Sequence, residues 1–311
     1  MSAVCCADND ERETIYNVCV GILMHAQGVF YMSQPFNSEA FQKFEFAGWE
    51  KIALPYQSAF GPLTSQAAAA IVEVLNPSKT SYLLDVASGP GYLAALAAKR
   101  GAKVIGIDFS PQVVEGAKSL YPNFRFEVAN AEALPFPENS FDALGMNFGL
   151  LHLANPETAL AEAYRVLLPG GNFAATVWAS PKETIGFGLI LDAIQQYGTL
   201  NPRNVSIPDG PAFFRFSEHQ EFERVLHKAG FRNIAIRQIP LVWQLPSPDS
   251  LFDIMYKSSV RNAALLYAQS EDTLVAIKTA VGIAAQAYQK EDGTVELPMP
   301  AVLVKATKPY K

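Results

Sequence analysis

Four residues around one glycine-rich turn have the types and spacing expected of a nucleoside-binding site. Gly89 and Gly91 carry no side chain, so a ligand can approach the backbone closely at this turn. Asp108 ends a later apolar stretch, and a carboxylate there can accept hydrogen bonds from both hydroxyls of a ribose. Asp85 precedes the first glycine by four residues and favours a positively charged group on the same ligand.

A strand–helix–strand unit is predicted to position these residues. Residues 82–87 form a short apolar run, which is typical of a strand buried on both faces of a parallel sheet. Residues 93–100 are rich in Ala and Leu and predict a helix, and residues 104–107 predict a second strand that ends at Asp108. Because such a unit crosses over right-handedly to a parallel neighbour, its ligand crevice lies at the carboxyl ends of the strands.

Two ligand classes fit this arrangement. Residues 89–94 satisfy the dinucleotide pattern G-x-G-x-x-G/A, and Asp108 follows at about the expected distance of ~20 residues. This match favours a nicotinamide-dependent oxidoreductase. Asp85 favours the other class, since a carboxylate is poorly placed beside a pyrophosphate but suits the ammonium of a methionine moiety.

Three further stretches follow the glycine turn in a recognisable order. Together with residues 84–91, the segments at 130–137, 140–143 and 162–171 resemble the ordered motifs of class I S-adenosylmethionine (SAM) methyltransferases of the small-molecule type, similar to those of ubiquinone and menaquinone biosynthesis. The resemblance covers about residues 49–178. Two positions depart from the family pattern: Ala87 stands where the family usually has glycine, and Asn130 where it usually has aspartate.

The resemblance implies an α/β fold with a doubly wound, seven-stranded, mostly parallel sheet, whose last strand is antiparallel, and with helical cap elements. It divides the chain into an N-terminal helical lid (1–75), a SAM-binding core (76–240), a helical cap insertion (241–297) and the final strand of the sheet (298–311).

The resemblance also implies SAM as cofactor, S-adenosylhomocysteine as product and a small-molecule methyl acceptor. The residues it assigns to the cofactor are Asp85, Ala87, Gly89, Gly91, Asp108, Phe109, Asn130, Ala131, Glu132, Asn147 and Phe148. A related hypothesis is a protein of the same fold that binds SAM without transferring the methyl group.

Candidates for the acceptor site come from the predicted lid and cap. The side chains expected to line an apolar or aromatic acceptor pocket are Trp49, Tyr56, Phe214, Trp243 and Met255. His152 follows the predicted fourth strand and is the candidate general base, with a helix-capping or packing role as its alternative. Arg215 and Arg261 could hold an acidic acceptor, but we interpret them as solvated or salt-bridged surface arginines. No cluster of metal ligands is apparent, so we expect no metal.

Composition limits the classes of partner. The net charge of −6 disfavours a general nucleic-acid binder, which needs a basic surface. No stretch of eighteen or more apolar residues predicts a membrane span. Acidic residues near the start are unlike a signal or transit peptide. The three cysteines indicate free thiols in a reducing compartment, so we expect a cytoplasmic protein. The sequence leaves the oligomeric state open.

Overall fold

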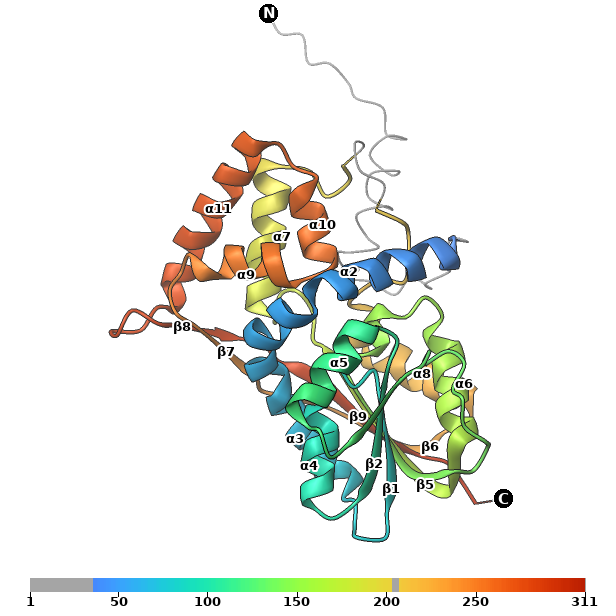
Figure 1. Ribbon diagram of the computed structural model, residues 1–311. Coiled ribbons are helices and arrows are strands. Elements are labelled where there is room, and N and C mark those ends of the chain that lie inside the picture. The colour runs from blue at the N-terminus through green and yellow to red at the C-terminus, as the bar shows by residue number, and fades with distance from the viewer. Residues whose placement is uncertain (1–35, 203–206, 311) are drawn as a thin grey trace, which may run out of the picture.

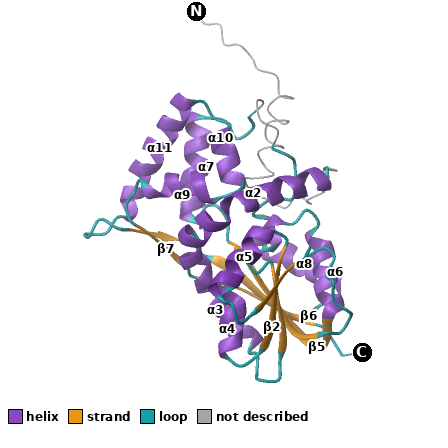
Figure 2. Ribbon diagram, in the orientation of Figure 1, coloured by secondary structure: helices purple, strands orange, loops and turns teal. Residues whose placement is uncertain are grey.

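A seven-stranded sheet forms the centre of the computed structural model, which describes residues 36–202 and 207–310 (Figure 2). Its strand order is β3-β2-β1-β4-β5-β9-β6, and β9 runs antiparallel to both of its neighbours. The strands are β1 (Tyr82–Val86), β2 (Lys103–Asp108), β3 (Arg125–Val128), β4 (Phe141–Asn147), β5 (Leu167–Trp178), β6 (Arg232–Ile239) and β9 (Ala301–Thr307). The predicted doubly wound sheet with an antiparallel last strand is confirmed.

Helices cover both faces of this sheet, as the apolar strands require. Leu83 and Leu84 are adjacent in β1 and therefore point to opposite faces, and both are fully buried. On one face lie α3 (Gly61–Leu75), α4 (Tyr92–Lys99) and α5 (Pro111–Leu120); on the other lie α6 (Pro156–Val166) and α8 (His219–Ala229) (Figure 1). The carboxyl ends of the strands stay open for a ligand.

A layer of helices lies beyond this carboxyl edge, at the top of Figure 1. It contains α2 (Ser38–Ala59), α7 (Ile185–Tyr197), α9 (Ser250–Ser258), α10 (Arg261–Tyr267) and α11 (Glu271–Ala285). A separate antiparallel pair, β7 (Val242–Leu245) with β8 (Val295–Pro298), joins this layer to the rest of the chain. The sequence did not predict that pair.

The predicted domain ranges correspond to these elements in different ways. Residues 1–35 of the expected lid lie outside the described residues. Of the rest, α2 lies in the helical layer, whereas α3 packs on the sheet with Ala67, Ala68 and Ile71 fully buried. The first helical part of the cap insertion is divided into α9 and α10, because the backbone is extended at Ser259.

Helix starts show where local sequence rules held and where they did not. Ser110, which precedes Pro111, caps α5 as N-cap rules require, with its Oγ accepting a hydrogen bond from the Val113 amide at 3.1 Å. Asn155 precedes Pro156 at the start of α6 in the same way, but its side chain does not cap the helix, because its amide donates to Glu132 instead. Ser217 does not cap α8 either: the helix begins after Glu218, and the Ser217 hydroxyl donates to the carbonyl of Phe214.

Candidate active site

The turn after β1 is left-handed at three positions and presents bare backbone to a cavity. Ala87, Gly89 and Gly91 have φ values of 54°, 52° and 86°. A Cβ added to Gly89 would meet no atom within 4 Å, so the space above it is open to a ligand. A Cβ added to Gly91 would lie 2.5 Å from the Phe126 ring, so this glycine is required for packing. Ala87 adopts the conformation that glycine prefers, at a modest cost in strain.

Asp108 both holds this turn and faces the cavity. Its Oδ2 accepts a hydrogen bond from the Gly89 amide at 3.0 Å, and its Oδ1 accepts one from the Ser110 amide at 3.1 Å. The side chain is almost fully buried, and burial raises its pKa to about 6. Near neutral pH the carboxylate is therefore mainly ionised and can accept hydrogen bonds from a ligand.

The cavity above the turn, here called the outer cavity, has a volume of about 320 Å³. That volume lies in the range of small-molecule sites, which starts at roughly 300 Å³. The residues predicted to bind the cofactor that line it are Ala87, Gly89, Asp108, Phe109, Asn130, Ala131, Glu132, Asn147 and Phe148. Asp85 and Gly91 do not line it. Gln42, Lys43 and Phe46 of α2 also line it, and the sequence did not single them out.

Asp85 lies beneath the turn and is fully buried. Its Oδ2 accepts a hydrogen bond from the Ala94 amide at 2.9 Å, whereas its Oδ1 has no partner within residues 36–202 and 207–310. Burial, with a smaller contribution from the charge of Asp108, raises the pKa of Asp85 to about 8. The ligand-free protein therefore holds Asp85 mainly as the neutral acid at pH 7.

This raised pKa makes stability depend on pH in a defined direction. Between pH 3.8, the ordinary pKa of the side chain, and about pH 8, the folded state keeps a proton on Asp85 that the unfolded chain has released. The free energy of unfolding of the ligand-free protein therefore falls as pH rises through this window. Asp85→Asn keeps an acceptor for the Ala94 amide and removes the titration.

We expect ligand-free Asp85→Asn to have a higher Tm than the wild type at pH 8 and a similar Tm at pH 4. Calorimetry at pH 4, 6 and 8 checks this, with the exposed Asp192→Asn as the matched control. A difference between variant and wild type that does not grow with pH contradicts the burial of a titrating Asp85.

The far wall of the outer cavity is a hydrogen-bonded loop after β3. Asn130 accepts the amide of Glu132 at 2.8 Å through its side-chain oxygen. The Glu132 carboxylate in turn accepts from Gln42 at 3.0 Å and from the Asn155 side chain at 2.8 Å. Glu132 therefore links α2, this loop and the start of α6.

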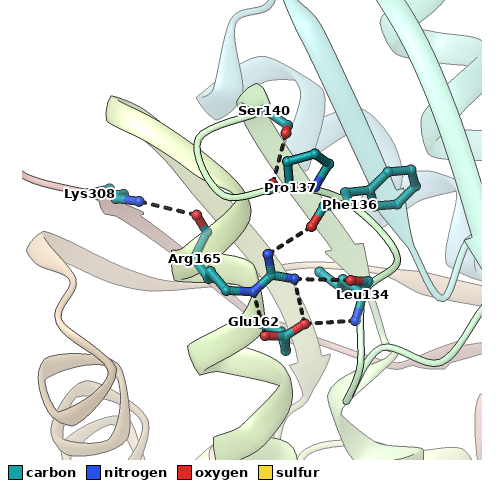
Figure 3. A network of polar contacts seen from close by, with 7 residues as sticks. All are labelled: Leu134, Phe136, Pro137, Ser140, Glu162, Arg165 and Lys308. Atoms are coloured by element: carbon teal, nitrogen blue, oxygen red, sulfur yellow. Dashed lines mark hydrogen bonds and ion pairs between the residues drawn. The ribbon is translucent and has the colours of Figure 1, made fainter.

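An arginine in α6 braces the next part of this loop (Figure 3). Arg165 donates to the carbonyls of Phe136 at 2.7 Å and Leu134 at 3.0 Å, and it pairs with Glu162 one turn earlier. Glu162 also accepts the amide of Leu134 at 2.8 Å. Glu162 and Arg165, at the start of the segment 162–171, therefore fix the loop that continues from the far wall.

A second, smaller cavity of about 70 Å³, here called the inner cavity, adjoins the outer one under the helical layer. Its aromatic lining is Trp49, Tyr56, Phe60, Phe148, Trp178, Phe187, Phe213 and Phe214. Four residues line both cavities, and they are Trp49, Tyr56, Phe148 and His152.

The five side chains predicted for the acceptor pocket separate into two groups. Trp49, Tyr56 and Phe214 line the inner cavity. Trp243 and Met255 line neither cavity and are almost completely buried. The Trp243 indole donates to the carbonyl of Ala59 at 3.1 Å, and its ring packs on Phe60, one layer behind the cavity wall.

The end of β4 forms the boundary between the two cavities. Asn147 donates to the carbonyl of Thr64 at 3.0 Å and accepts from the Thr176 hydroxyl at 2.7 Å, so its side chain is fixed. Phe148 follows with a φ of 57° and stacks on Trp178 at 4.0 Å between ring centroids. A left-handed phenylalanine is uncommon, and this strain turns its ring into the inner cavity wall.

His152 is held by a buried ion-pair network that the sequence did not reveal. Its Nδ1 lies 3.0 Å from Oε2 of Glu45, and Oε1 of Glu45 lies 2.7 Å from Nε of Arg261. Glu45 is fully buried. Burial alone would raise its pKa, but Arg261 and His152 outweigh that effect and hold the pKa below its usual range. Arg261 is therefore salt-bridged, as predicted, but it is partly buried and does not lie on the open surface.

Within the described ranges, no group of three or more His, Cys, Asp or Glu side chains could hold a metal ion. No helix in those same ranges has both the length and the apolarity needed to cross a membrane.

Residues 84–175 match the family model of a methyltransferase domain. The chain is 32% identical over 181 residues to the ubiquinone/menaquinone biosynthesis C-methyltransferase UbiE of Rickettsia bellii, covering 52% of this chain and 73% of that protein. It is 34% identical to UbiE of Brucella abortus, covering 54% of this chain and 69% of the relative. The alignment with the demethylmenaquinone methyltransferase of Thermus thermophilus is 40% identical and covers 35% of this chain but only 51% of the relative.

Solved structures agree on the fold. Phosphoethanolamine N-methyltransferase 2 of Haemonchus contortus, solved with SAM, superposes with a TM-score of 0.52 at 19% identity, covering 86% of this chain and 60% of that one. A SAM-dependent methyltransferase of Thermotoga maritima gives a TM-score of 0.51 at 18% identity, covering 85% of this chain and 99% of that one. With the glycine turn, Asp108 and the two adjoining cavities in place, the relatives establish that the chain belongs to the class I SAM-dependent methyltransferase family that includes the UbiE enzymes.

Proposed function

We propose that this protein transfers a methyl group from SAM to a small, neutral, largely aromatic acceptor bound in the inner cavity. The observation that carries the proposal is the shared wall: Trp49, Tyr56, Phe148 and His152 line both cavities. Ligands bound in the two cavities would therefore lie next to each other, with these four side chains at their contact. Such enclosure aligns the two reactants and excludes water.

The outer cavity fits the cofactor in its charges and its space. Bound SAM supplies an electrophilic methyl group on a sulfonium. Gly89 leaves open space for the ligand, and Asp108 presents an ionised carboxylate suited to two ribose hydroxyls. Asn130, Ala131 and Glu132 are placed to line the adenine edge, and Asn147 and Phe148 to border the sulfur. Asp85 acts from beneath the turn, as a carboxyl whose Oδ1 has no partner among the described residues and which a nearby cation would ionise.

The inner cavity favours a neutral acceptor. Its walls are aromatic, and Arg261, the cation among its lining residues, is neutralised by Glu45 at 2.7 Å. An acidic acceptor would have to compete with that ion pair. The cavity volume of about 70 Å³ is about half that of a cavity of ~150 Å³ that holds benzene, so the ligand-free cavity encloses only part of a single ring. The relatives named for ubiquinone and menaquinone biosynthesis make a hydroxylated, quinone-like ring the first candidate.

His152 is placed to remove a proton from such an acceptor. It lines both cavities, and its Nδ1 is engaged by Glu45. A ring hydroxyl that gives up its proton becomes a stronger nucleophile, either at its oxygen or at a ring carbon. His152 therefore acts as general base where the two ligands meet.

Purified protein incubated with SAM and a panel of single-ring phenols and hydroquinones tests this function. We expect S-adenosylhomocysteine and an equal amount of methylated acceptor, measured by mass spectrometry, only when a ring acceptor is present. Tight SAM binding with no product across the panel contradicts the proposal and favours a SAM-binding protein without transferase activity. Quenching of tryptophan fluorescence by SAM but not by NADH excludes the oxidoreductase hypothesis at the same time.

A further inference from the structure

We propose that Glu45 is a positioning residue that fixes the tautomer of His152, and that Arg261 anchors both Glu45 and the turn carrying His152. The proposal deepens the function proposed above and rests on it for the role of His152. The helical layer would then orient the base, because Glu45 lies on α2 and Arg261 on α10. His152 itself lies on the 3₁₀ turn Leu150–His152 after β4.

The burial of Glu45 is the first argument. Its side chain has no exposed surface, and a buried carboxylate is stable only when it is paired and hydrogen-bonded. Both of its oxygens are used: Oε1 receives Nε–H of Arg261 at 2.7 Å, and Oε2 lies 3.0 Å from Nδ1 of His152. The carboxylate is therefore matched on both oxygens by groups from two other elements.

The tautomer follows from the hydrogen-bond chemistry. With Arg261 as its ion partner, Glu45 is a carboxylate, which can only accept hydrogen bonds. The 3.0 Å contact then requires the proton of the neutral imidazole to be on Nδ1. Nε2 consequently carries the lone pair. This is the tautomer that a general base needs, because Nε2 is the nitrogen that Glu45 leaves for the acceptor.

All three guanidinium nitrogens of Arg261 donate hydrogen bonds. It donates to the carbonyl of Leu151 at 2.6 Å and to that of Pro211 at 2.9 Å, besides its bond to Glu45. Its guanidinium lies over the rings of Phe41 and Phe213, at 4.7 and 5.2 Å from their centroids. Because Leu151 directly precedes His152, Arg261 fixes the backbone of the base as well as its hydrogen-bond partner.

The proton moves from the acceptor to the imidazole of His152. The acceptor hydroxyl loses its proton to Nε2, the imidazole becomes imidazolium, and Glu45 at Nδ1 stabilises the new charge. The charged groups that influence His152 are Glu45 from α2, Arg261 from α10 and Asp108 across the outer cavity. Of these, only Glu45 contacts the ring through a hydrogen bond.

Glu45→Gln is the primary test. Its side-chain amide can donate to Nδ1 and thereby place the proton on Nε2, which blocks the base. We expect kcat to fall by about 10²-fold to 10³-fold, with the Kd of SAM changed by less than about threefold and the rising limb of the pH–rate profile moved to lower pH. Glu45→Asp keeps the carboxylate and should recover part of kcat. Glu73→Gln, on the exposed face of α3, is the matched control.

A spectroscopic readout keeps the test independent of turnover and of variant folding. In wild-type protein labelled with 15N-histidine, we expect long-range correlation spectra to show His152 protonated at Nδ1, with the signal identified by its loss in His152→Gln. The Nε2-protonated form in the wild type overturns the proposal, as does Glu45→Gln with unchanged kcat. If the wild type methylates no acceptor, the proposed function fails while the tautomer measurement still decides the role of Glu45.

Discussion

Asp108→Ala is expected to raise the Kd for SAM by at least about tenfold. The carboxylate is the group placed to accept the ribose hydroxyls, and hydrogen bonds to charged groups contribute about 1.5–3 kcal/mol each. The same side chain holds the Gly89 and Ser110 amides at 3.0 and 3.1 Å, so its loss also loosens the turn over which the cofactor lies. Both effects weaken binding.

Isothermal titration calorimetry at pH 7.5 measures this change, because Asp108, with its pKa of about 6, is ionised there. Asp192→Ala, an exposed change on α7, serves as the control and should bind SAM like the wild type. Asp108→Ala with wild-type affinity contradicts the placement of the ribose at the end of β2.

His152→Gln is expected to lower acceptor-dependent kcat by about 10²-fold to 10⁴-fold, the usual contribution of a general base. Glutamine can still donate to Glu45 and fill most of the same volume, but it cannot take a proton. The Kd of SAM should change little, because the loss concerns the acceptor proton.

Initial rates of S-adenosylhomocysteine formation at saturating SAM check this prediction. His219→Gln, at the exposed start of α8, is the matched histidine control. If His152→Gln retains kcat within about fivefold of the wild type, the histidine packs the cavity wall, and the acceptor loses its proton without a base.

The arrangement of residues around the outer cavity could be predicted from the sequence because its geometry is local. Strand, glycine turn and helix follow one another within 82–100, and Asp108 ends the neighbouring parallel strand, so topology alone brings Asp108 to Gly89. Asp85 shows the limit of this reasoning. Its position predicts a charge near the turn, but not that the carboxyl lies beneath it, bonded to the Ala94 amide.

The network beside the inner cavity could not be predicted because its contacts join distant parts of the chain. Glu45 is 107 residues from His152 and 216 from Arg261, and no periodicity relates them. The one available signal was a single acid between Phe44 and Phe46 in an aromatic helix.

Composition also does not indicate which aromatic rings line the inner cavity. Trp49 and Trp243 are both tryptophans of the cap segments, yet only Trp49 lines the cavities. Trp243 is fixed behind the wall by its bond to Ala59. Tertiary packing, which the sequence does not display, decides between the two.

A crystal structure of the protein with S-adenosylhomocysteine bound tests the central claim most directly, namely that the outer cavity delivers the reactive end of the cofactor to the inner one. The account predicts the ribose on Asp108, the adenine beside Asn130, and the sulfur at Phe148 facing the aromatic inner cavity. A ligand whose sulfur lies away from Phe148 and His152, with the inner cavity closed off from it, would contradict the account.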